Sequence, residues 1–160
     1  MDDRALLDAH AAVHRWLEER AYATIEALVA TDVVRARVLF DGFARVLAEH
    51  MAFEDERVLP VYTRVAPKDG PGRADHVEGD HTILRRHVDA IVALLDEVEG
   101  APLRAVLERL PVVYRLLGTL EHHTAREQNN VYPALARALP SAIDDVTAAL
   151  TGLVKRASAT

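Results

Sequence analysis

The sequence predicts an all-α protein, an up-down-up-down four-helix bundle with a short additional C-terminal helix. Alanine, leucine, valine, arginine and glutamate dominate the composition and aromatic residues make up only 5%, which favours helix over strand. Apolar residues recur at steps of three and four along four long stretches, as they do on one face of a helix. Proline, glycine and capping residues mark the breaks between these stretches.

One domain accounts for the whole chain. Its 160 residues are enough to bury a core, and half of them are hydrophobic, which argues against disorder. We therefore expect a single domain over residues 1–160, with the bundle at about residues 3–135 and the additional helix at about residues 141–156.

The first half of the chain predicts two helices. The first should span about residues 3–29. Thr31 or Asp32 can cap the second, because both side chains carry an oxygen that accepts from a free helical amide. The second helix should run to about residue 59 and end or kink at Pro60, whose ring blocks the helical hydrogen bond.

The second half predicts two further long helices. Residues 66–75, rich in proline, glycine and charge, form the clearest loop. A third helix should cover about residues 76–98 and stop at Gly100. A fourth should cover about residues 102–128, with its opening proline suited to a first turn and Pro111 as a kink.

The additional helix should open on Ser141. Together with Asp144 three residues later, this serine resembles a capping box, in which side chains at both positions accept from free amides. The connections between the long helices are short, so that successive helices should run antiparallel.

A histidine occupies a core position in the apolar stripe of each long helix. In the second and fourth helices a glutamate follows it one turn later. Two of these histidines lie early in their helices and two lie late, so antiparallel packing should bring all four to one level. The four histidines are His10, His50, His81 and His123.

The two halves of the chain repeat this pattern. The segments HMAFEDERVLP, from His50, and HTAREQNNVYP, from His123, both read histidine, glutamate four residues on and proline six further on. His10 precedes His50 by 40 residues, and His81 precedes His123 by 42. The repeat selects these four of the eight histidines, and its glutamates are Glu54 and Glu127.

Residues of these types at this spacing point to metal binding. An ionised carboxylate is costly to bury in an apolar layer, and two at one level repel each other. A pair of cations would neutralise both, and mixed imidazole and carboxylate ligation suits iron, manganese or zinc. Four neutral histidines and two carboxylates fit two ions bridged by the carboxylates. The alternative is a polar layer in which the six residues pair only with one another.

The pattern H…HxxxE…H…HxxxE, on four helices and with proline after each HxxxE segment, resembles the hemerythrin-like (HHE cation-binding) family. The resemblance covers about residues 5–133. It implies two iron ions, in preference to manganese or zinc, with an oxo or hydroxo group completing the bridge. By position, it places His10 and His50 on one iron and His81 and His123 on the other, and makes the two glutamates the bridging ligands.

One departure from the family bears on function. Oxygen-carrying hemerythrins have a fifth histidine one turn from the third-helix histidine, and usually an aspartate as the last bridge. Here Val77 and Arg85 stand four residues either side of His81, and Glu127 is the last bridge. Without a replacement for the fifth histidine, both metals keep an exchangeable position. We therefore expect a symmetric, open pair, which suits peroxide, nitric oxide or redox chemistry better than reversible oxygen transport.

Several other polar residues are weaker candidates. His14, one turn from His10, is either an extra ligand or, as we favour, a partner of a ligand. Glu78 and His81 form the Glu-x-x-His spacing of ferritin-like di-iron proteins, but only once. Tyr114 is the tyrosine expected first at the site. Tyr62 and Tyr132, like Tyr114, either line the pocket or hydrogen-bond a ligand, or serve in packing alone. His76 and His87 are expected at the surface, and His122 is expected to face solvent or to support a ligand. Asp55 and Glu56 are expected on an ordinary polar face, with support of a ligand as the lesser alternative.

These observations favour a di-iron protein that reacts with hydrogen peroxide, dioxygen or nitric oxide, with catalase- or peroxidase-like turnover if it is an enzyme. The alternatives are a non-catalytic oxygen, redox or iron sensor and a reversible oxygen-binding protein.

The net charge of −6 argues against nucleic-acid binding. The chain has no cysteine, no apolar run long enough to span a membrane and no signal-peptide pattern, so we expect a cytoplasmic protein.

Overall fold

A computed structural model describes residues 3–159, and the prediction of one domain therefore extends beyond it at residues 1, 2 and 160. The all-α prediction is confirmed, because the described residues form helices, turns and loops without a strand. None of the described helices is both long and apolar enough to cross a lipid bilayer.

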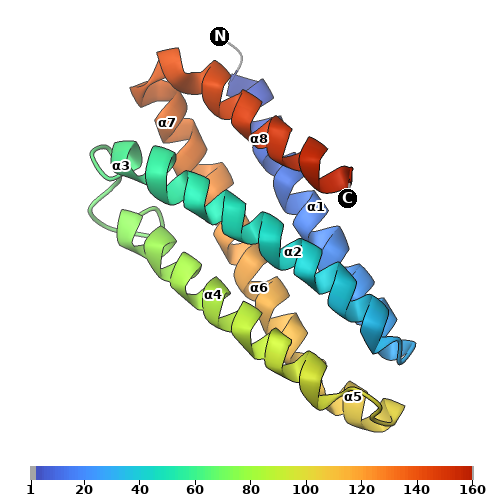
Figure 1. Cartoon of the computed structure of the whole chain (residues 1–160). Coiled ribbons are helices and arrows are strands. Elements are labelled where there is room, and N and C mark those ends of the chain that lie inside the picture. The colour runs from blue at the N-terminus through green and yellow to red at the C-terminus, as the bar shows by residue number, and fades with distance from the viewer. Residues whose placement is uncertain (1–2, 160) are drawn as a thin grey trace.

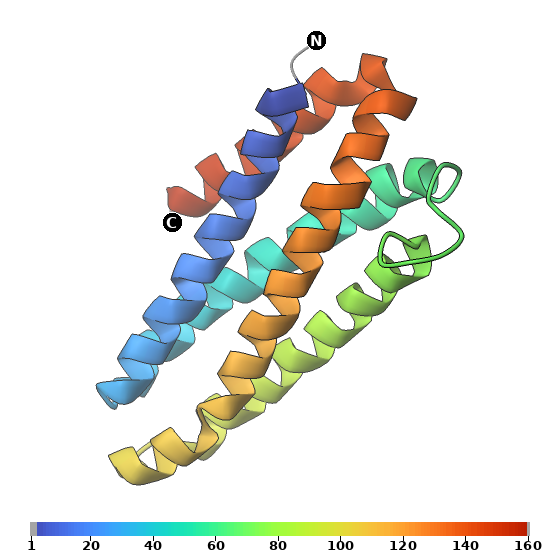
Figure 2. The same ribbon diagram turned by 180° about the vertical axis from the view of Figure 1, so that it is seen from behind.

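Within the described part, the helices form four long rods that lie side by side, with successive rods running in opposite directions (Figures 1 and 2). The first rod is α1 (Asp3–Val29) and the third is α4 (Ala74–Glu97). The second joins α2 (Val33–Phe53), the π-helical turn η1 (Glu54–Val58) and α3 (Leu59–Tyr62). The fourth joins α6 (Pro111–Arg126), the π-helical turn η2 (Glu127–Val131) and α7 (Tyr132–Ala138).

Shorter elements complete the chain. Helix α5 (Leu103–Arg109) precedes the fourth rod, and a 3-10 turn, η3 (Pro140–Ala142), leads into α8 (Ile143–Ser158). Helix α8 folds back along the first half of the molecule and packs against α1 and α2 (Figure 1). The four rods bury their apolar stripes against one another, with Leu17, Phe43, Leu84 and Leu116 among the buried residues.

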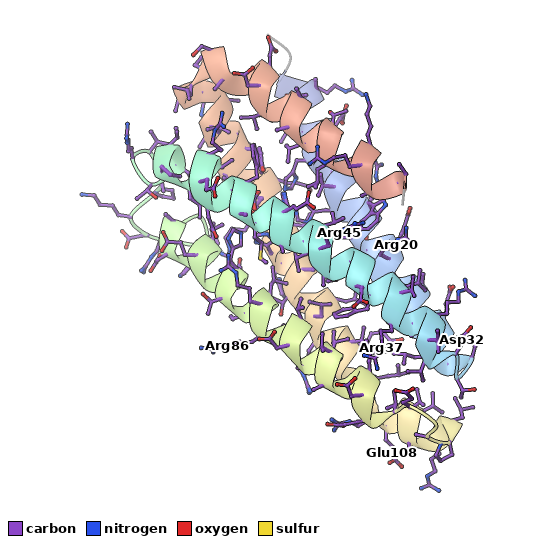
Figure 3. All side chains as sticks on the ribbon, in the orientation of Figure 1. Arg20, Asp32, Arg37, Arg45, Arg86 and Glu108 are labelled. Atoms are coloured by element: carbon purple, nitrogen blue, oxygen red, sulfur yellow. The ribbon has the colours of Figure 1, made fainter. Side chains whose placement is uncertain are left out.

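The charged side chains lie mostly on the outside of the rods. Arg86 and Glu108 are among those that point outward in Figure 3. Arg37 links two rods, because its Nη2 lies 2.9 Å from Oδ1 of Asp96 at the end of α4.

Proline shapes both rods that carry the repeat. Pro60 was predicted to end or kink the second helix. Instead, a π turn precedes the proline and the rod continues through it to Tyr62. Proline has no amide to donate, and the ladder shifts so that the residue before it donates five residues back. The amide of Leu59 donates to the carbonyl of Glu54, and that of Tyr132, before Pro133, donates to Glu127.

Pro111 has a stronger effect than the predicted kink. It divides the predicted fourth helix into α5 and α6, and the rod that follows extends to Ala138, beyond the predicted end near residue 128. The loop after Tyr62 ends two residues earlier than predicted, because α4 begins at Ala74.

The two predicted caps have different outcomes. Asp32 caps α2, with its Oδ1 3.0 Å from the amide nitrogen of Arg35 that donates to it, whereas Thr31 closes the preceding turn at a φ of 56°. The capping box at Ser141 is wrong. Pro140 starts a 3-10 turn that contains Ser141, and α8 begins only at Ile143, with no side-chain cap.

Replacing Asp32 with alanine should lower the free energy of unfolding by about 1 kcal/mol, because an amide of the first turn of α2 loses its acceptor. Ser141→Ala is the matched control and should change it by less than about 0.5 kcal/mol. Denaturant unfolding of both variants measures the difference. Equal losses would contradict this account of the two caps.

Candidate metal centre

The six residues predicted from the repeat are all buried between the rods. His10, His50, His81, His123 and Glu127 are 0% exposed, and Glu54 is 1% exposed. They come from α1, α2, η1, α4, α6 and η2, so that all four rods contribute to one layer. The structure therefore brings together the residues that periodicity assigned to the core.

A first set of donors lies between α1 and α2. Nε2 of His10 is 2.8 Å from Oε2 of Glu127, and Nε2 of His50 is 3.9 Å from the same oxygen. Nε2 of His50 is also 3.4 Å from Oε1 of Glu54. Two histidines from the first half of the chain thus face one oxygen of each glutamate.

His14 belongs to this first set, although the sequence favoured a supporting role for it. Its side chain is 4% exposed, and its Nε2 lies 2.9 Å from Nε2 of His50 and 3.1 Å from Oε2 of Glu127. The ligand atoms of four buried residues lie within 4.8 Å of one another, a grouping able to hold one metal ion: His10, His14, His50 and Glu127.

A second set lies between α4 and α6. Nε2 of His81 is 3.3 Å from Oε2 of Glu54, and Nε2 of His123 is 4.0 Å from the same oxygen. Nε2 of His123 is 3.1 Å from Oε1 of Glu127. His123 also belongs to a compact grouping of ligand atoms with His50, Glu54 and Glu127, whereas His81 stands outside that grouping and reaches the layer through Glu54.

Both glutamates divide their oxygens between the two sets. Glu127 turns Oε2 toward the first set and Oε1 toward His123. Glu54 turns Oε1 toward His50 and Oε2 toward His81 and His123. A carboxylate with one oxygen directed at each of two donor sets has the orientation of a bridging ligand.

Four inward-facing atoms of the second set have no hydrogen-bond partner among the described residues. They are Nε2 of His81, Nε2 of His123, Oε2 of Glu54 and Oε1 of Glu127. A buried polar atom without a partner costs roughly 1–3 kcal/mol, and more when it is charged. A cation coordinated by these four atoms would remove that cost, so the residues present fit a metal ion.

Outer hydrogen bonds set the tautomers of two histidines. Nδ1 of His81 is 2.7 Å from Oδ1 of Asp55, which only accepts when ionised, so in the neutral ring this nitrogen carries the proton and Nε2 keeps its lone pair. Oδ2 of Asp55 in turn accepts from Arg85 at 2.7 Å. Sequence reasoning assigned Asp55 to an ordinary polar face, but the structure makes it the partner of a candidate ligand.

His14 is held in the same way by a hydroxyl. Oγ1 of Thr124 donates to the carbonyl of Leu120 at 2.7 Å, and its free lone pair lies 2.7 Å from Nδ1 of His14. Nδ1 of His14 is therefore the donor, and its Nε2 presents a lone pair to the cluster. Burial also lowers the pKa of His14 well below its usual value, which keeps the ring neutral and able to bind a cation.

For Tyr132 the sequence left packing and a hydrogen bond at the site as equal alternatives, and the structure places it in contact with the buried layer. It is fully buried and donates its hydroxyl to Oε1 of Glu54 at 2.7 Å, while its ring centroid is 4.4 Å from that of His10. Burial and the neighbouring carboxylates raise its pKa well above the usual value, so that it remains a donor.

Asp80 lies on the outer side of His123. Its Oδ2 is 3.8 Å from Nδ1 of His123 and 2.8 Å from Nε of Arg126.

The other candidates lie away from the layer. Tyr114, expected first at the site, is 53% exposed, and Tyr62 donates its hydroxyl to the carbonyl of Gly72. Glu78 faces solvent, which removes the ferritin-like pairing with His81. His76, His122 and Glu56 are exposed as predicted, but His87 is half-buried and 3.1 Å from Oγ1 of Thr119.

Comparison with protein-family models, with curated proteins and with solved structures found no match to the chain. The case for a metal centre therefore stands on the geometry of these residues.

In the metal-free protein, His81 and His14 should affect stability with opposite pH dependence. Burial disfavours the charged ring of His81, but Glu54 and Asp55 outweigh this effect and raise its pKa above the usual value of about 6.5. The contribution of His81 to the stability of the fold is therefore present below about pH 6.5 and lost as pH rises through the raised pKa. The pKa of His14 is lowered, so its contribution is present above about pH 6.5 and lost as pH falls.

Unfolding of the wild type, His81→Gln and His14→Gln in chelator at pH 5.5 and 8.5 checks these signs. The difference in free energy of unfolding between wild type and His81→Gln should shrink at the higher pH. The corresponding difference for His14→Gln should shrink at the lower pH. The same trend for both variants would contradict the assignment.

Asp55→Asn should weaken metal binding by about ten- to a hundredfold, because the neutral amide can donate as well as accept and no longer fixes the proton of His81 on Nδ1. Glu56→Gln is the matched control, since Glu56 is the next residue, is exposed and should leave affinity unchanged. Metal titration in competition with a chelator measures both. An equal effect on the two variants would show a general loss of charge instead.

Proposed function

We propose that the chain is a hemerythrin-like, up-down-up-down four-helix bundle that binds two iron ions between its rods. The observation that carries the proposal is the division of the carboxylate oxygens, since Glu54 and Glu127 each direct one oxygen at each donor set. The unpartnered buried atoms of the second set support it further. Imidazole nitrogens and carboxylate oxygens together suit iron, although manganese or zinc can take the same donors.

The two donor sets are unequal. The first offers three histidines, His10, His14 and His50, and one oxygen from each glutamate. The second offers only His81 and His123 with the other two oxygens. The expectation of a symmetric pair assumed that nothing replaces the missing histidine of the third helix. His14 on α1 supplies a fifth histidine, so the second set has the more open coordination.

The proposed activity is reaction with a small oxidant: hydrogen peroxide, dioxygen or nitric oxide. An iron pair would supply a redox couple and an open coordination position on the side of His81 and His123. The protein residues hold the donors in place and keep water away. Asp55 and Thr124 hold two of the rings, and the Tyr132 hydroxyl lies within hydrogen-bond distance of a carboxylate of the centre. With peroxide as substrate, this is catalase- or peroxidase-like turnover.

Reversible dioxygen binding is the second candidate, and the inequality of the two sets favours it. A carrier requires one protected ion and one open ion, and His14 provides that difference. The same geometry serves either function, so the response to oxidants has to decide between them.

Anaerobic loading should give two iron ions per chain. His123→Gln and Glu127→Gln should each reduce the count or weaken binding at least about tenfold, because each removes a donor atom of the second set. His122→Gln is the matched control, since the neighbouring His122 is exposed. His14→Gln should weaken the first ion more than the second. A count below two in the wild type, or unchanged binding in both donor variants, would overturn the site.

Mixing the loaded protein with oxidants then tests the activity. Rapid oxygen release from peroxide, or peroxide loss with a reductant, supports turnover. A stable adduct that releases dioxygen under vacuum supports the carrier instead. Strong stabilisation by iron with neither response would contradict both and favour a sensor, because metal binding of this kind stabilises the fold directly.

A further inference from the structure

A groove runs along the surface between α1 and α6 and encloses about 520 Å³. This volume lies within the range of small-molecule sites. Its lining extends from Ala11 to Tyr22 on α1, about 16 Å at 1.5 Å per residue, and from Tyr114 on the antiparallel α6 to Gln128 in η2, about 21 Å. The lining residues thus run along both helices for several turns.

The groove reaches the candidate metal centre through His14. His14 and Thr124, which are hydrogen-bonded to each other, both line it. The opposite edge of the imidazole faces His50 and Glu127, so that the ring of His14 lies between the groove and the other members of the first donor set. A molecule in the groove would therefore lie one side chain from a candidate ligand set.

Small residues leave the groove open, and aromatic residues line one end. Gly118 lines it, and a Cβ at this position would meet no atom within 4 Å. Leu117 and Leu120 give an apolar wall, while Tyr22 and Tyr114 are 46% and 53% exposed at the end farthest from Gln128. Two exposed aromatic rings beside an apolar wall suit a flat aromatic ligand.

The charged residues of the groove disfavour an anion. Glu18 and Glu121 line it with a single cation, Arg15. Within residues 3–159 these three side chains form no hydrogen bond or ion pair with one another or with other groups. The carboxylates are therefore available to accept from ligand hydroxyl groups, and the excess of one negative charge repels carboxylates and phosphates.

We propose that this groove binds a small neutral phenol, such as phenol or hydroquinone, as the reducing substrate of the adjacent centre. The reducing role rests on the proposed function, whereas the binding itself does not. Each phenol would lose one electron and its hydroxyl proton and leave as a phenoxyl radical. Two such oxidations supply the two electrons and two protons that convert one hydrogen peroxide into two water molecules.

Binding is measured by calorimetry and by saturation-transfer NMR on the iron-loaded and the metal-free chain. Phenol should bind more tightly than cyclohexanol, which has the same size without an aromatic ring, and more tightly than anionic benzoate. Gly118→Phe should weaken phenol binding at least about tenfold by filling the groove, and Gly118→Ala should change it less than about twofold. Tyr114→Ala should weaken it roughly two- to twelvefold.

Circular dichroism and iron content verify that each variant folds, and Ala125→Phe on the same wall replaces Gly118→Phe if that variant does not. Equal binding of phenol and cyclohexanol, undiminished binding when the groove is filled, or no phenol binding at millimolar concentration would overturn the proposal. Phenol binding to a chain that fails to take up two irons would uphold the groove and overturn the proposed function. Uptake of two irons without phenol binding would uphold the metal site and overturn the groove proposal.

Discussion

The structure depends on one constraint, which is that two glutamates and five histidines share a single buried layer. An apolar interior does not tolerate unpaired charge, and the surrounding groups are arranged to neutralise or orient each of these side chains. Burial favours a raised pKa for Glu127, but the charge of His123 and the hydrogen bonds with His10, His14 and His50 hold this pKa well below its usual value. Farther out, Asp55 and Thr124 fix the orientation of two imidazoles. The apolar stripes of the four rods enclose this layer on both sides.

The sequence repeat is symmetric, but the folded molecule is not. His14 has no counterpart in the second half, where Arg85 stands four residues after His81 and lies at the surface. Helix α8 also favours one half, since it packs against α1 and α2. The first donor set is therefore richer in nitrogen and lies on rods that have an additional covering helix. This difference gives two nearly equivalent sets of side chains distinct chemical character.

Periodicity and the repeat were sufficient to place the six residues in one buried layer, because burial and position along antiparallel rods follow from helical spacing alone. His14 could have been assigned to the centre by the same rule, since it follows His10 by one turn. Tyr132 could not. In an α-helix it would lie about 140° around the axis from Glu127, whereas the π turn brings it back above Glu127. The contact between His81 and Asp55 was also out of reach, because it joins different rods and depends on their rotation about their axes.

The π turns determine how the chain can change length near the centre. Each turn acts as one extra residue within a continuous helix, placed directly after the glutamate and before the proline. Loss of a residue between Glu127 and Tyr132 would convert the π turn into an α-helical turn, in which the tyrosine, then four residues after Glu127, would still lie about one turn beyond it. A single-residue deletion there would thus keep the tyrosine on the same side of the rod, whereas a change of the same five residues from π turn to α-helix without a deletion would turn it away from Glu54.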